Sequence, residues 1–370
     1  MLTSQTHRCE YPATKSSPQP QLSSLPSPPR RSSSSRQASE ESSWSDPRIA
    51  SILNEDDVPA AAVAQQGYHR SDVFEVLRHF VSPTDHVWIG SPCSQGIVQE
   101  HVRRNAATAP YLLHSALAFS AAHMQYLNPT VNKYRVAAPY HYQHSLRRYF
   151  DKLSETLKGD DAGSLLVSCE LHAFLAFMNA GSGHNGRPGV DLGWVRSMRG
   201  MQFIMQSPHL MSSLERSAFH PILRKNAHSW QRICEQEQRD NNARVAGDLR
   251  QLRALEHLII TYAHPDHQPV LSHSLSMLRD LAHIHPQPAA IGAFTIWINR
   301  QPSELIDLLQ LEEPLALLML GMWCVMFGRI DEWWIVGSAR SEARKICEQV
   351  ERIGDRRLGG VVGYLESLCR

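Results

Sequence analysis

The amino-acid sequence predicts an all-α protein, with about ten helices over residues 68–370 preceded by a disordered Ser/Pro-rich segment over residues 1–67. Two observations predict this organisation. From Ser71 onward, apolar residues recur every three or four positions, and the alternation typical of β-strands is nearly absent. Before that point, a polar, Pro/Ser-rich composition prevails. No repeat of fixed period is present, so we expect one helical domain and not a solenoid.

The N-terminal segment lacks the apolar side chains that a folded core requires. Residues 15–43 read KSSPQPQLSSLPSPPRRSSSSRQASEESS and carry both charge signs with few large apolar groups. Such a segment cannot bury enough apolar surface to offset the entropy lost on ordering. We therefore predict that residues 1–67 are a disordered linker.

Helix stops divide the first half of the domain. Pro83 ends one amphipathic stretch, and Asn128-Pro129 ends another, which opens with Thr108 as a cap and Pro110 in its first turn. Four helices are predicted in this half. Two are given by their ranges, Thr108–Leu127 and Asp161–Ala180. The other two are given by their apolar faces, which are Val73, Val76, Leu77 and Phe80 in the first, and Leu146, Tyr149, Phe150, Leu153 and Leu157 in the second.

A glycine-rich loop, Gly181–Gly189, opens the second half. Its spaced glycines match the dinucleotide-binding pattern, but that pattern requires a preceding strand, and the segment before it is predicted to be helical. An interhelical loop is the better interpretation. The predicted helices that follow are Leu192–Gln206, Leu249–Tyr262, Val270–Ile284, Ala289–Asn299, Ser303–Gln310, Glu313–Phe327 and Glu332–Ile353.

Several whole-chain features narrow the class of protein. The longest apolar run, Pro314–Gly328, would rise about 22 Å as a helix, short of the ~30 Å bilayer core, so we expect a buried helix and no membrane span. The first ten residues hold no apolar signal core. Seven cysteines without Cys-x-x-Cys spacing favour a reducing, intracellular compartment. The net charge of +1 offers no evident basic surface for nucleic acid.

The twenty histidines raise the question of a metal site. His141 and His144 are three residues apart, and His264, Asp266 and His267 crowd one loop. A metal site needs three or four convergent ligands, and no Glu-x-x-His or His-Glu-x-x-His motif occurs. Signatures of a nucleophile elbow, a phosphate loop or a kinase are also absent. We expect no metal, cofactor or enzyme activity in this chain.

Tryptophan and methionine gather toward the C-terminus. Methionine adapts to irregular apolar cavities, and such residues suit a flat apolar ligand, so they are the predicted lining of a ligand pocket. Core packing accounts for the same residues without a ligand, and composition alone favours core packing. The predicted pocket residues are Trp297, Met319, Met322, Trp323, Met326, Trp333 and Trp334.

Three stretches resemble one known family. They are PYLLHSALAFSAAHMQYLNP (Pro110–Pro129) continued by AAPYHYQHSLRRY (Ala137–Tyr149), then WVRSMRGMQFIM (Trp194–Met205), and PLALLMLGMWCVMFGRIDEWWIVGSAR (Pro314–Arg340), whose Trp-Trp pair is expected to open a helix. In this order and spacing they resemble the regulatory domain of fungal zinc-cluster transcription factors, in the branch typified by sterol uptake control proteins. The resemblance extends over residues 70–353.

What the resemblance implies is an all-helical regulatory domain that senses a ligand or partner. It implies a sterol-like or other apolar ligand held among the C-terminal helices. It further implies a nuclear protein that also moves through the cytoplasm, and control of sterol or secondary-metabolite genes. A homodimer is one assembly that the resemblance allows.

The DNA-binding module of that family, six cysteines holding two zinc ions, is missing from this chain. Cys9, in HRCEYP (7–12), resembles the last ligand of such a cluster, because an acidic residue, an aromatic residue and often Pro follow it in the family. Either an upstream exon carries the other five cysteines or the protein lacks the module. One thiolate cannot build a binuclear cluster. We therefore expect zinc only with an upstream cluster, and DNA binding only through such a module or a partner protein.

Three functions remain open at this point. A ligand-responsive transcriptional regulator is the leading one. The second is a co-regulator or interaction scaffold that never contacts DNA, and a search for Cys-x2-Cys-x6-Cys upstream of Met1 would separate the two. The third is a helical enzyme acting on a lipid or terpenoid. It would require convergent acidic or histidine residues, and the lack of an Asp-rich motif counts against it.

Overall fold

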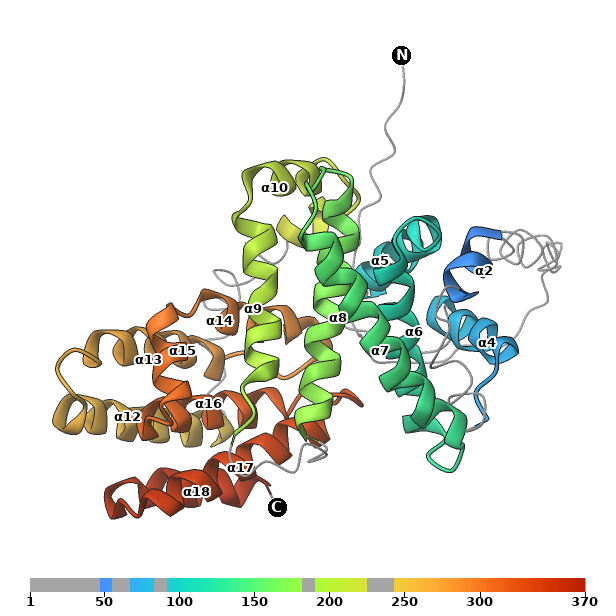
Figure 1. The fold of residues 1–370 in the computed structure, drawn as a ribbon. Helices are drawn as coiled ribbons and strands as arrows, with labels where there is room; N and C mark the ends of the chain where they lie inside the picture. Colours follow the sequence, from blue (N-terminus) through green and yellow to red (C-terminus); the bar gives the residue numbers. More distant parts are fainter. Residues whose placement is uncertain (1–46, 55–66, 83–91, 182–189, 225–242, 370) are drawn as a thin grey trace, which may run out of the picture.

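The computed structural model describes residues 47–54, 67–82, 92–181, 190–224 and 243–369, and every regular element in these ranges is helical (Figure 1). The predicted all-α class is confirmed. The first group of helices is α2 (Pro47–Asn54), α4 (Arg70–Val81), α5 (Pro92–Asn105), α6 (Pro110–Leu127), α7 (Asn132–Leu153), α8 (Asp161–Gly181), α9 (Gly193–Gln206) and α10 (Pro208–Glu215). The second group is α12 (Ala243–Tyr262), α13 (Gln268–Ala282), α14 (Ile291–Arg300), α15 (Ser303–Gln310), α16 (Pro314–Phe327), α17 (Val336–Ile353) and α18 (Gly359–Cys369), with short 3-10 helices at Pro288–Ala290 and Arg356–Leu358.

Three helices with almost no polar face organise the core. α6, α8 and α16 carry buried side chains around most of their circumference, so each must be enclosed by other helices. α4, α5 and α7 pack around α6, and α12, α13, α17 and α18 pack around α16. α8 runs between these groups, in contact with α6 and α7 on one side and with α9 and α17 on the other (Figure 1).

The helix ends follow the predicted stop signals. α4 ends at Val81, before Pro83, and α6 ends at Leu127 with Asn128 as its C-cap. The N-terminal signal of α6 is only partly correct. Pro110 occupies the first turn as predicted, but Ala109 and not Thr108 is the N-cap residue.

The predicted disordered linker extends too far. Residues 47–54, which lie within it, form α2, and Ile49 and Ile52 are 1% and 6% exposed. Together with Leu53 they give the i, i+3, i+4 apolar spacing of a helix that packs on the core. The composition of the longer segment masked this short pattern. Residues 1–46 and 55–66 lie outside the described residues, so the prediction of disorder there is not tested.

The described part of the chain also holds helices that were not predicted, including α5, α10 and α18. Three glycines lower the intrinsic helix propensity of α18, but Val361, Val362 and Leu365 are buried and stabilise it on its neighbours. The stripe predicted for α7 is wrong at two positions. Phe150 is 63% exposed, and Leu157 lies beyond the end of the helix.

One helix of the described part, α8, is long and apolar enough to cross a membrane by length and composition, and α15 with α16 passes only as a pair bent by 104°. In α8, 78% of the apolar window is buried inside the fold. The apolar character of α8 is therefore accounted for by its central position between the two groups of helices.

A buried ion pair connects α12, the end of α16 and α18. Asp248 is fully buried, and its Oδ1 accepts hydrogen bonds from Nη2 of Arg329 at 2.8 Å and from the hydroxyl of Tyr364 at 2.7 Å. Its Oδ2 accepts a second bond from Arg329. A carboxylate is favourable inside a protein only when its lone pairs are used in this way.

Candidate functional site

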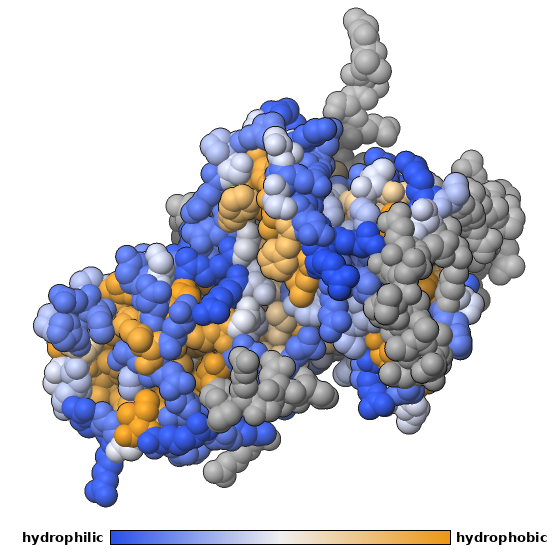
Figure 2. Space-filling view, viewed as in Figure 1, coloured by the Kyte–Doolittle hydropathy of each residue, from blue (hydrophilic) through white to orange (hydrophobic). Residues whose placement is uncertain are grey.

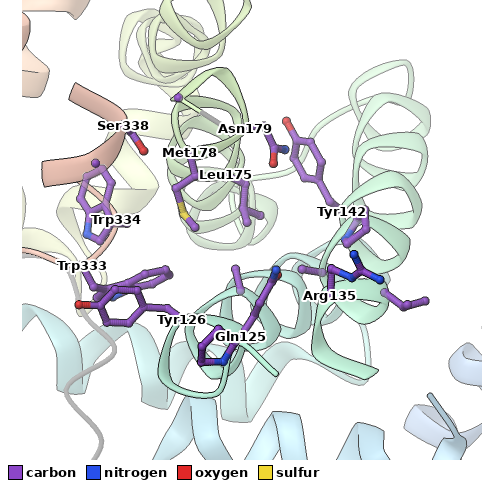
Figure 3. A pocket seen from close by; sticks show the side chains of 17 residues that line it. Gln125, Tyr126, Arg135, Tyr142, Leu175, Met178, Asn179, Trp333, Trp334 and Ser338 are labelled. Carbon is purple, nitrogen blue, oxygen red and sulfur yellow. The ribbon is translucent and has the colours of Figure 1, made fainter. Parts of the chain in front are cut away.

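A groove of about 1040 Å³ opens where α6, α7 and α8 meet the residues that lead into α17 (Figure 3). This volume is near the upper end of the range of small-molecule sites, which is roughly 300–1,000 Å³. Its walls come from both groups of helices, because α6 and α7 belong to the first group and Trp333 to Ser338 belong to the second.

One side of the groove is aromatic. The ring of Trp333 lies 5.7 Å from that of Tyr126 and 5.4 Å from that of Phe119, measured between centroids. Trp334 is 1% exposed and packs 4.2 Å from Phe174, so it contributes to the groove wall from within the core. These indole faces offer an apolar surface that is partly open to solvent.

The opposite side is polar. Gln125, Arg135, Tyr142 and Asn179 line it (Figure 3). Nε and Nη2 of Arg135 donate to Oδ1 of Asn132 at 3.1 and 2.7 Å. Burial raises the pKa of Tyr142 to about 12, so this side chain is a neutral phenol at physiological pH and can donate or accept a hydrogen bond.

Two residues shape the helices around the groove. Pro139 lies inside α7 and has no N–H, so it cannot donate the usual helical hydrogen bond to the carbonyl of Arg135. Gly181 ends α8, and a Cβ at this position would lie 2.5 Å from Cα of Ser338. α8 and α17 therefore approach this closely only because residue 181 is glycine.

The structure brings two of the seven predicted pocket residues to this groove, Trp333 and Trp334. Both lie in the turn before α17, which begins at Val336, so the expectation that the Trp-Trp pair opens a helix is wrong. The other five are at most 2% exposed, belong to the hydrophobic core and do not line the groove; they are Trp297, Met319, Met322, Trp323 and Met326.

Trp323 is the middle of a tryptophan stack in that core. Its ring lies 5.4 Å from that of Trp194 and 6.3 Å from that of Trp297, with interplanar angles of 24° and 25°. Its indole N–H donates to the carbonyl of Phe294 at 3.0 Å. Core packing therefore accounts for the position of Trp323.

Several of the histidines form a buried cluster. Both ring nitrogens of His141 form hydrogen bonds. Nε2 pairs with the hydroxyl of Tyr68 at 2.8 Å, and Nδ1 pairs with Nδ1 of His114 at 2.9 Å. Burial lowers the pKa of His141 well below its usual value, so this imidazole is neutral. His144 is also buried and stacks on His114 with centroids 5.5 Å apart.

Among the described residues, no group of three or more His, Cys, Asp or Glu side chains is arranged to hold a metal ion. His264 and Asp266 lie 3.6 Å apart in an exposed turn.

His172 provides a test of how burial affects stability. The single proton of the Ser145 hydroxyl is donated to the carbonyl of Tyr111 at 2.6 Å, so Nε2 of His172 donates to Oγ of Ser145, also at 2.6 Å. Burial lowers the pKa of His172 to about 3, whereas a histidine in the unfolded chain titrates near 6.5. Below pH 6.5 the unfolded state therefore binds more protons at this residue, and stability falls as the pH falls.

We expect His172→Gln to weaken the pH dependence of unfolding. When the pH falls from 7.5 to 5.5, the variant should lose about 1.4 kcal/mol less unfolding free energy than the wild type. The reason is that only the wild type has a histidine here that is protonated in the unfolded state and neutral in the folded state, over about one pH unit below 6.5. Urea unfolding at the two pH values measures this difference. The same substitution at the exposed His209 controls for the loss of an imidazole, and an unchanged pH dependence in His172→Gln would contradict the prediction.

The glycine pattern that opens the second half lies mostly in residues 182–189, outside the described residues. The segment before it is α8 and not a strand, as predicted. Comparison of the chain with family models, with curated proteins and with solved structures finds no match.

Proposed function

We propose that this chain is the regulatory part of a transcriptional regulator of the fungal zinc-cluster type, and that the groove is its ligand site. The observation that carries the proposal is where the resembling stretches meet. Pro110–Pro129 and Ala137–Tyr149 supply α6 and most of α7, and Pro314–Arg340 supplies α16 and the Trp333 segment. Both sets contribute to the groove wall.

The second resembling stretch supports the same unit from within. Trp194, at the start of α9, stacks on Trp323 of α16, and its indole N–H lies 3.4 Å from a carboxylate oxygen of Glu342 in α17. α9 also packs along α8, whose side chains form part of the groove wall. The stretches that carry the resemblance are thus in contact in one packed body.

A regulatory mechanism follows from the position of the groove. A ligand that contacts both groups of helices stabilises the arrangement in which they face each other as seen here, and so shifts the population of the domain toward it. A sterol-like or other apolar molecule fits the aromatic side. The regulator would act in the nucleus, through a DNA-binding module or a partner protein, on sterol or secondary-metabolite genes.

The proposal can be tested with the full chain fused to a DNA-binding module of known target sequence, with a reporter gene downstream of that target. Gly337→Phe is the blocking variant, because a Cβ at Gly337 meets no atom within 4 Å and the ring would extend into the groove. Gly363→Phe in α18 is the matched control, since Gly363 is also an exposed helical glycine with an open Cβ position and does not line the groove.

We expect the fusion to change reporter transcription, and Gly337→Phe to shift that output several-fold while Gly363→Phe leaves it unchanged. In parallel, a panel of sterols, terpenoids and fatty acids is screened for thermal stabilisation. A ligand at 100 times its Kd adds about 2.7 kcal/mol to the free energy of unfolding. A fusion without transcriptional effect, together with a panel that produces no concentration-dependent shift, would reject the proposal.

An interaction scaffold is the second candidate function. Phe203 and Met205 on α9 are 58% and 45% exposed, and Ile260 and Tyr262 on α12 are 66% and 49% exposed. In Figure 2, hydrophobic residues form patches over the C-terminal helices and along the line between α8 and α9. Such patches are typical of protein interfaces. A homodimer in solution that Phe203→Ser dissociates would favour this function.

A further inference from the structure

Arg135 introduces a positive charge into an otherwise neutral groove wall. Among the described residues, the groove lining contains no charged side chain other than Arg135. Two of its five N–H donors go to Asn132, which is uncharged. Asp191 lies close enough to Tyr142 to raise the pKa of that phenol, but Asp191 does not line the groove.

The groove is divided between this charge and an apolar surface. Figure 3 shows Arg135 on one side, near Gln125, and Trp333 and Trp334 on the other, with Met178 between them and Asn179. A molecule that satisfies both sides must carry an apolar body and a hydrogen-bond-accepting end. A guanidinium group pairs best with a planar anion that accepts two hydrogen bonds, which is the geometry of a carboxylate.

A second feature that attracts anions is the N-terminal end of α17, where Gly337 and Ser338 line the groove. This helix end carries only about half a unit of positive charge, whereas the guanidinium of Arg135 carries a full one. An anionic group is therefore better placed at Arg135 than at α17.

We propose that the groove binds an amphiphile with one carboxylate head, held at Arg135, and an apolar body that lies over Trp333. This inference rests on the proposed ligand-binding role of the groove and specifies the chemical class of the ligand. The volume of about 1040 Å³ is sufficient for a long-chain or polycyclic acid.

The test uses the full chain and two carboxylates of different shape, oleate and abietate, each compared with its methyl ester below its micelle concentration. Calorimetric titration measures the affinities for the wild type and for two variants. Arg135→Gln removes the charge at the groove. Arg147→Gln removes an exposed charge from the same helix outside the groove and is the matched control.

We expect at least one carboxylate to bind about two- to fivefold more tightly than its ester, the size of effect typical of an exposed ion pair, because Arg135 is exposed. Arg135→Gln should abolish this preference and leave the affinity for the ester unchanged, and Arg147→Gln should leave both affinities unchanged. Equal binding of acid and ester, a preference that survives Arg135→Gln, or no binding of any probe would overturn the inference.

The outcomes also separate this inference from the proposed function. A carboxylate preference that depends on Arg135, in a protein whose reporter output ignores Gly337→Phe, would retain the site and remove the regulatory role. If a neutral sterol binds the wild type but not Gly337→Phe, and acids are not preferred over esters, the regulatory role would be retained and the carboxylate specificity rejected.

Discussion

Asp248→Ala is expected to lower the free energy of unfolding by about 3–5 kcal/mol, the cost of breaking a buried ion pair from one side. The substitution leaves the guanidinium of Arg329, 17% exposed, without its counter-charge, and it removes the acceptor of the Tyr364 hydroxyl. Three segments distant in sequence lose their common contact. Urea unfolding followed by circular dichroism would show a lower midpoint.

Two variants make the test specific. Removing both charges with Asp248→Leu and Arg329→Met should recover much of the lost stability, because no unpaired buried charge then remains. Arg104→Ala breaks an ion pair with Glu100 in which the arginine is 70% exposed, and it should change stability by less than about 1 kcal/mol. A loss below about 1 kcal/mol in Asp248→Ala would mean that the buried pair contributes no more than an exposed one.

Trp323→Ala should destabilise the protein by about 3–5 kcal/mol, because it deletes the central ring of the tryptophan stack and leaves a cavity. Trp323 is fully buried between Trp194 and Trp297, so neither neighbour can move into the space without breaking its own contacts. The carbonyl of Phe294 also loses its hydrogen-bond donor. Thermal or urea unfolding measures the loss.

Trp333→Ala is the comparison that distinguishes core from groove. Trp333 is only partly buried, so its removal should lower the free energy of unfolding by about 1–2 kcal/mol. This loss corresponds to the part of its apolar surface that the fold shields from water. If Trp333→Ala proves the more destabilising of the two, the groove wall and not the tryptophan stack is the main support of the fold. Indole added to Trp323→Ala should recover part of the stability by filling the cavity.

Most of the fold could be predicted from the sequence because many of its helices are bounded by recognisable start and stop residues. Ser303–Gln310 was predicted with its observed ends, and the stops at Pro83 and Asn128 fall where α4 and α6 end. Three of the overlooked helices, α2, α5 and α10, do begin at a proline that follows Asp or Ser, a start signal that was not recognised there. α2 is short and follows a long polar segment, and α18 contains three glycines, so tertiary packing rather than local propensity decides that these residues are helical.

The candidate site could be predicted only in part, because composition does not say which apolar residues face one another. Trp323 and Trp333 are ten positions apart in sequence, yet one is fully buried and the other lies at the groove. Tyr126 and Arg135 lie on either side of the helix stop at Asn128-Pro129, outside any apolar cluster in the sequence, so no sequence pattern marks them as groove residues. The pairing of α6 and α7 with the Trp333 segment depends on contacts between residues about 200 positions apart, as in the 5.7 Å approach of Tyr126 and Trp333.

The position of the groove also has a consequence for the cooperativity of unfolding. Its walls belong to two groups of helices, each built around its own buried helix, α6 in one and α16 in the other. α8 contacts helices of both groups, and the ring contacts of Trp333 with Phe119 and of Trp334 with Phe174 also join them. The buried side chains of the two groups thus form one hydrophobic core, so we expect them to unfold in a single transition. A molecule in the groove contacts both groups and raises the temperature of that one transition.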